Sequence, residues 1–261
     1  MSSPPSSRDS AEKPLLALLV LAVLAITLLV YGSHRKQRAN SQQAIRDQLN
    51  AIADLKVDQI ARWRRELEGD ANWVLEASAV SLWARDFFTN PADSGARSNL
   101  VRWMESWRAR HHYWRVMLVD TNLQARLSSP AKEQWTGPVA EAFLRRALTT
   151  NAVLFSDLHR DLVTERVNLD IHIPLLPWTG AGTPAKPIGV LVFEIAPEQF
   201  LFPTIQTWPT PGSTAETLLV RREGEEVVFL NELRHQTNTA LKLRLSVARL
   251  DLPASRAVRG E

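Results

Sequence analysis

The sequence contains no cysteine in 261 residues. The absence of cysteine excludes disulfides, thiolate-bound metals and cysteine catalysis. It is compatible with a location on either side of a membrane. An excess of charge is also lacking, because the formal net charge is only +3. No basic stripe with interleaved aromatic residues is present, so we expect no nucleic-acid partner. We find no cofactor motif and expect none to be bound.

Charge is absent again between residues 14 and 33, where "LLALLVLAVLAITLLVYG" is almost wholly apolar. About twenty helical residues span the roughly 30 Å hydrocarbon layer, so we predict a transmembrane helix at 14–33. The alternative is a cleaved signal peptide, but the run is long for one and no A-x-A site follows. Residues 1–13 are expected to be a disordered cytoplasmic tail. Two basic residues precede the span and three follow it, so flanking charge does not settle the orientation.

After this run, apolar residues recur at steps of three and four, from Ile45 through Leu49 and onward to Val74. The pattern predicts one long stalk helix over 38–90, a segment without proline. A period near 3.5 permits pairing with a second copy of the chain, and we expect a homodimer through this helix. Packing of the helix on its own domain is the alternative.

The pattern changes to strands beyond residue 114. Five runs, "WRVMLVD", "LQARLSS", "AVLFSDL", "RVNLDIHIPLL" and "PIGVLVFEIAP", surround one helix, "GPVAEAFLRRALT". They predict an antiparallel α+β lobe over 96–207. A proline-dense connector leads to a second, incomplete β lobe over 208–261, which begins with a hairpin around Gly224. The expected fold class is therefore α+β, with a transmembrane and stalk helix before two unequal β lobes.

This order of elements resembles the double Cache sensor modules, which are PAS-like, of bacterial transmembrane receptors. The phrases "AIADLKVDQIARWRRELEGDA", "VLFSDLHR" and "TWPTPGSTAETLLVRREGEEVVFLNELRH" are similar to the extracytoplasmic region of sensor histidine kinases and PAS/GGDEF-type signalling proteins. The resemblance implies a periplasmic sensor that binds a small molecule. The sequence has no second span, phosphoacceptor helix or GGDEF signature, so the output domain of that family is absent here. The family's amino-acid-binding pattern does not align residue by residue.

Candidate binding residues come from the polar side of the fourth predicted strand and its neighbours. The strand alternates strictly, which puts three polar side chains on one face. Such groups could orient a ligand in a partly apolar pocket, although a solvated face is the alternative. An arginine could grip a carboxylate bidentately, which favours an amino acid or a carboxylate as ligand. The candidates are Arg115, Asp157, His159, Asn168, Asp170 and His172.

The polar cluster "NELRH", which begins at Asn231, is interpreted as the end of a hairpin. Glu232 and His235 have a spacing that could suit a metal, but Arg234 between them would repel a cation and no third ligand is near. We therefore predict no metal site and no catalytic residue, and whether the chain belongs to an enzyme stays uncertain. Asn231 and Arg234 are expected to bind backbone groups or the neighbouring lobe.

Together these features predict a sensory input module in the bacterial inner membrane, single-pass in this chain. Its sensor lobe is expected in the periplasm, with a small molecule, the membrane and a second copy as partners. Two alternatives come from other classes: a non-catalytic dimerisation scaffold and an anchored envelope enzyme. The first needs no pocket, and the second needs convergent catalytic groups that the sequence does not offer.

Overall fold

The computed structural model describes residues 9–131, 138–161, 164–177, 186–209 and 215–260. It divides the chain into two compact units, residues 1–57 and 58–261. Unit 1 is helical throughout its described residues. It forms most of α1, which begins at Asp9 and ends at Glu76. The predicted disordered tail 1–13 is therefore wrong for its last five residues, which are helical.

No helix in the described parts of the chain has both the length and the hydropathy needed to cross a membrane. The segment 14–33 is helical, and the side chains at 14–18, 20, 22 and 23 lie outside the described residues.

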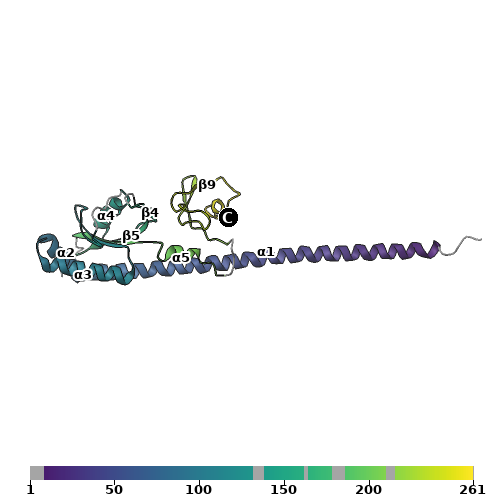
Figure 1. The fold of residues 1–261 in the computed structure, drawn as a ribbon, viewed down its shortest axis with the longest axis horizontal. Helices are drawn as coiled ribbons and strands as arrows, with labels where there is room; N and C mark the ends of the chain where they lie inside the picture. The colour runs from purple at the N-terminus through teal and green to yellow at the C-terminus, as the bar shows by residue number, and fades with distance from the viewer. Residues whose placement is uncertain (1–8, 132–137, 162–163, 178–185, 210–214, 261) are drawn as a thin grey trace, which may run out of the picture. The chain divides into compact units, whose positions relative to one another are not determined.

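Unit 2 begins in α1 and continues with α2 (Ser78–Thr89) and α3 (Ser94–His111). The single helix predicted over 38–90 is thus interrupted at Ala77, whose extended backbone separates α1 from α2. The interruption lets α2 and α3 pack on each other and, with the end of α1, on the first sheet (Figure 1).

The first sheet contains the five predicted strands and one short addition. Its order is β2-β1-β6-β5-β3, with β4 also paired to β5, and every pairing is antiparallel. The bounds are β1 (Arg115–Asp120), β2 (Ala125–Ser129), β3 (Leu154–Phe155), β4 (His159–Arg160), β5 (Val167–Leu175) and β6 (Gly189–Ile195).

The two faces of this sheet are covered by different helices. Ile171, Ile173 and Phe193 belong to the main core with α1, α2 and α3. The other face packs Met117 and Val192 against Leu144 and Ala147 of α4 (Pro138–Thr150). Because both faces are covered, all nine residues of β5 are buried. The solvated face considered as an alternative for β5 is therefore wrong.

A short helix, α5 (Leu201–Gln206), lies between the two sheets in the chain. The second sheet follows, with β7 (Val220–Glu223), β8 (Glu226–Phe229) and β9 (Arg244–Ser246). Gly224, with φ of 61°, makes the predicted hairpin turn. The last strand is only three residues long, since the positive φ of Asn238 and Leu241 turns the backbone before it. A final helix, α6 (Pro253–Ala257), ends the described fold.

The polar cluster after β8 has the structural role that was predicted. Asn231 is fully buried, and its Oδ1 accepts a hydrogen bond of 2.7 Å from the backbone N–H of Leu219. Arg234 donates to the carbonyl of Ala215 at 3.0 Å. Glu232 accepts hydrogen bonds from Thr239, including its backbone N–H at 2.8 Å. The interpretation as a hairpin end is confirmed.

Candidate functional site

A row of ionisable side chains crosses the α4-covered face of the first sheet. Arg115, Glu194 and Asp170 are direct cross-strand neighbours on β1, β6 and β5. Side chains that are opposite each other in this way share a face. Strand β4 adds His159, whose Nε2 lies 3.4 Å from Asp170 Oδ2. We call these four residues the polar row.

Arg115 and Glu194 form a buried, two-pronged ion pair. The guanidinium Nε donates to Glu194 Oε2 and Nη2 donates to Oε1, both at 2.8 Å. Burial raises the pKa of Glu194, and the hydrogen bonds and charge of Arg115 oppose this rise. Both prongs of the arginine are therefore occupied, so its predicted role as the clamp for a ligand carboxylate is not supported.

Asp170 is the least satisfied member of the polar row. It is 1% exposed, and its Oδ1 has no hydrogen-bond partner in the described part of the chain. Burial raises the pKa of Asp170 well above 3.8, the charge of Glu194 adds to the rise, and Arg115 opposes it. A buried acceptor without a donor is costly, which makes this oxygen a candidate for binding a ligand.

The remaining candidates differ in their surroundings. Asn168 is buried and its Oδ1 also has no hydrogen-bond partner among the described residues. His172 is fully buried and stacks on Phe143 of α4, with ring centroids 5.4 Å apart. Burial and the nearby His159 lower the pKa of His172 to about 3, so its ring is neutral at physiological pH. Asp157 is different, because its side chain is 89% exposed.

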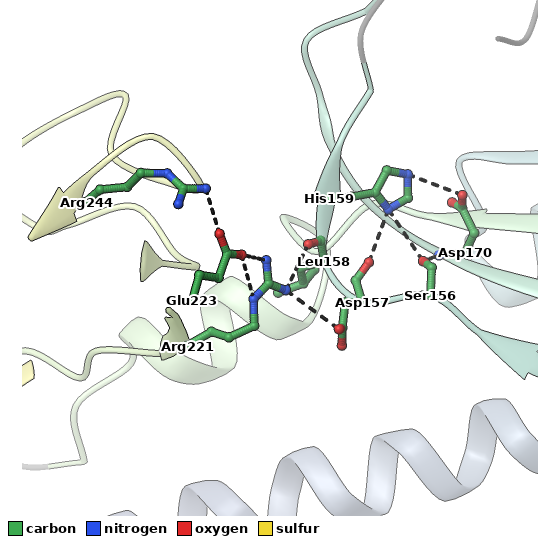
Figure 2. Close-up of polar contacts among 8 residues, drawn as sticks. All are labelled: Ser156, Asp157, Leu158, His159, Asp170, Arg221, Glu223 and Arg244. Atoms are coloured by element: carbon green, nitrogen blue, oxygen red, sulfur yellow. Dashed lines mark hydrogen bonds and ion pairs between the residues drawn. The ribbon is translucent and has the colours of Figure 1, made fainter. Parts of the chain in front are cut away.

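Figure 2 shows two members of the polar row, His159 and Asp170, together with the contacts that lead from the β4 segment to the second sheet. His159 Nδ1 lies 3.1 Å from the carbonyl oxygen of Asp157. Arg221 of β7 donates to the carbonyl of Leu158 at 3.4 Å, and it is also paired with Glu223, which in turn pairs with Arg244 at 2.8 Å. The segment around β4 therefore contacts Asp170 on one side and the second sheet on the other.

Sequence reasoning found Asp170 and His159 but missed Glu194 and Arg221. Glu194 stands alone among apolar residues in "GVLVFEI" on β6. A charged residue inside a buried strand needs a partner, so this glutamate was a detectable signal. Arg221 has no such signal, because its contacts depend on the placement of two separate sheets. Two recesses of about 530 and 560 Å³ also lie in the described part of unit 2, and none of the six candidates lines either.

Solved structures with a similar fold include ligand-binding domains of Pseudomonas chemoreceptors. The domain of the Pseudomonas fluorescens chemoreceptor CtaA in complex with L-serine is 14% identical, with a TM-score of 0.50 over 77% of each chain. The domain of the Pseudomonas aeruginosa PAO1 amino acid chemoreceptor PctC in complex with GABA is 17% identical, with a TM-score of 0.50 over 75% of this chain and 79% of that chain. The sensor domain of the V. cholerae histidine kinase DctB is 12% identical, with a TM-score of 0.46 over 59% and 57%.

No protein-family model and no curated protein sequence matches the chain. The structural similarity extends over three quarters of the chain and over a similar share of the chemoreceptor domains. The predicted resemblance to double Cache sensor modules is thus confirmed at the level of the fold.

Proposed function

We propose that this chain is an extracytoplasmic sensory input module whose polar row binds a small molecule through a protonated primary amine. The observation that carries the proposal is the buried, unpartnered Oδ1 of Asp170. An ammonium group would supply both the donor and the positive charge that this carboxylate lacks. Fold similarity to domains in complex with L-serine and GABA supports the same class of ligand.

The arrangement favours an amine over a simple carboxylate. Arg115 already holds Glu194 with both prongs, and Arg160 donates to the carbonyl of Ala240 at 2.6 Å. Neither arginine is therefore available as a new anion clamp without breaking existing bonds. Asn168, with its unpartnered Oδ1, would accept a further N–H from the same ligand.

Ligand entry would couple to the second sheet through the segment that contains β4. Asp170 is almost fully buried, so a ligand can reach it only when neighbouring segments move. Strand β4 is short and, like β3, is held to β5 by only two residue pairs, which are His159↔Asn168 and Arg160↔Val167. Displacing it would alter the Leu158–Arg221 contact (Figure 2). A ligand with unequal affinity for the two arrangements would then shift their populations.

Binding is tested with the full chain, by calorimetry and thermal shift. GABA, L-serine and putrescine represent amines, and succinate represents a carboxylate without an amine. We expect at least one amine to raise Tm and succinate to have no effect. Asp170→Asn should lower the affinity for the amine at least tenfold, because it removes the charge partner. Asp86→Asn, on the exposed surface of α2, should bind normally.

Two outcomes would contradict this assignment. A response to succinate alone would place an anion site elsewhere. If no compound in a wide screen of amines, amino acids and organic acids raises Tm, the dimerisation scaffold becomes the better interpretation.

We further propose that α1 anchors the chain in the bacterial inner membrane, with unit 2 in the periplasm and a second copy paired along the stalk. The support comes from side chains of unit 1. Large apolar residues between 19 and 31 are each more than half exposed, and such a surface requires a cover. These residues are Leu19, Leu21, Leu24, Ile26, Leu28, Leu29, Val30 and Tyr31. Ile45, Leu49 and Leu55 are also exposed and would be covered by the second copy.

Two single-cysteine variants test topology and pairing separately, because the chain has no cysteine of its own. Asp47→Cys puts a thiol on an exposed position of α1 on the opposite side from Ile45 and Leu49, and Leu49→Cys puts one on the proposed dimer contact. We expect a membrane-impermeant maleimide to label Asp47→Cys in intact spheroplasts, and mild oxidation of Leu49→Cys to give a disulfide-linked dimer. Labelling only after lysis would overturn the periplasmic orientation, and a monomer after oxidation at both Leu49 and a second site, Leu55→Cys, would overturn the pairing.

A further inference from the structure

A separate recess of about 530 Å³ lies on the face of the first sheet that packs against α1, α2 and α3. Its walls come from α1, the end of α3 and the segment that follows β6. Ile195 lines it, and this residue points to the opposite face from its neighbour Glu194 in the polar row. The volume is within the range of small-molecule sites. The recess is therefore distinct from the site proposed above.

Aromatic side chains form one part of the recess. Trp63 of α1 and Phe200 stack with their ring centroids 5.5 Å apart and an interplanar angle of 23°. Phe200 is 41% exposed, so part of its ring is open to solvent. Tyr113 also lines the recess, but its side chain is only 3% exposed and its ring stacks on Phe193. Exposed ring faces attract organic cations through their negative quadrupole.

Two carboxylates complete the lining. Glu66 and Asp70 are four residues apart on α1, and they therefore lie on the same side of the helix. Asp70 Oδ2 lies 2.7 Å from His111 Nδ1 and accepts a hydrogen bond of 3.1 Å from the Tyr113 hydroxyl. Glu66 is exposed. Among the described residues no lysine or arginine lines the recess, and its other titratable groups are His112 and His111, which pairs with Asp70. The negative charge that the recess offers a cation therefore comes mainly from Glu66, which has no ion-pair partner in the described part of the chain.

We propose that this aromatic–acidic cleft binds a quaternary or other fully alkylated ammonium compound. Such a cation has no N–H to donate and is held by ring faces and nearby negative charge, which are the two features that the cleft combines. The polar row has the opposite need, since the Asp170 oxygen lacks a hydrogen-bond donor. The two sites therefore take different classes of amine.

Occupancy would also have a structural consequence. The ligand would contact α1 through Trp63 and Glu66, and the segment between β6 and α5 through Phe200. That segment is the connection from the first sheet to the second. A bound cation would thus hold the connector against the helix.

The test uses the full chain in mild detergent, with choline as the probe and 3,3-dimethylbutan-1-ol as its uncharged isostere. Binding is followed by calorimetry and by tryptophan fluorescence, since Trp63 is part of the site. We expect choline to bind and the alcohol to bind at least about fivefold more weakly, the factor that about 1 kcal/mol of cation–π energy corresponds to. Trp63→Ala and the isosteric Glu66→Gln should each weaken choline binding by about the same factor.

Glu76→Gln is the matched control, because Glu76 is an exposed glutamate of the same helix outside the cleft. Circular dichroism shows whether Trp63→Ala is folded, and Glu66→Gln carries the test if it is not. Absence of choline binding, equal binding of the alcohol, or unchanged affinity in Glu66→Gln would each overturn the proposal. Loss of choline binding in Asp170→Asn with Glu66→Gln unaffected would instead assign the cation to the polar row.

Discussion

Replacing Arg115 with methionine is expected to lower the free energy of unfolding by about 3–5 kcal/mol. The guanidinium is the sole ion-pair partner of Glu194 among the described residues, and the side chains are 5% and 1% exposed. Without it, a carboxylate stays in a buried position next to Asp170, its cross-strand neighbour. The cost is the burial of an uncompensated charge, because methionine itself fills much of the vacated volume.

The measurement is urea unfolding of the full chain, with a double variant as the decisive comparison. Arg115→Met combined with Glu194→Met removes both charges and should recover most of the lost stability, since buried ion pairs are often replaceable by apolar residues. Arg126→Met is the control, because the Arg126–Asp120 pair is partly exposed and should contribute about 1 kcal/mol or less. If the double variant is as unstable as the single one, shape rather than charge explains the effect.

The pair also shows what sequence patterns could and could not predict. Alternation in "RVNLDIHIPLL" correctly put Asn168, Asp170 and His172 on one face of a strand. The burial of that face depends on α4, which packs there from a separate part of the chain. The partnership of Arg115 with Glu194 joins residues 79 positions apart, and only the strand register aligns them. The sequence pattern did not reveal Glu194 as the ion-pair partner of Arg115. Arg115 was therefore predicted to bind a ligand carboxylate instead.

Local signals succeeded where the chemistry was local. Gly224 predicted a tight hairpin, and the structure has positive φ at that residue. The end of the first helix was missed, since "LEASAV" around Ala77 contains neither glycine nor proline. Helix α2 bends away there because its apolar face, with Val80, Ala84 and Phe87, packs in the main core. Tertiary packing thus overrides a sequence that would allow a continuous helix.

Asp170→Asn is expected to stabilise the ligand-free protein at neutral pH. Burial raises the pKa of Asp170 above its ordinary value of 3.8. Between 3.8 and the higher pKa of the folded state, the folded chain keeps a proton that the unfolded chain has released. The free energy of unfolding therefore falls as pH rises through this window. Asparagine has similar size and no proton to lose. Its advantage should be absent near pH 4 and should grow to about 1–3 kcal/mol at pH 8, the usual cost of an unsatisfied buried polar group.

Urea unfolding of both proteins between pH 4 and 8 measures this difference. The charged and titratable neighbours of Asp170 are Glu194, Arg115, Asp161 and His159, and they are identical in the two proteins. Asp86→Asn should show no pH-dependent gain, because Asp86 is exposed. A constant loss of stability in Asp170→Asn at every pH would mean that the carboxyl group only supports the fold.

A gain in stability together with loss of amine binding has a direct physical meaning. The carboxyl group that destabilises the empty protein is the group that an ammonium ligand would neutralise. Ligand binding should then release a proton in the pH window above 3.8 in which the empty protein keeps Asp170 protonated, because the cation favours the ionised form. Calorimetry between pH 4 and 8, in buffers of different ionisation enthalpy, detects this release. Its absence in the native protein, with affinity intact, would show that the amine is held by another group.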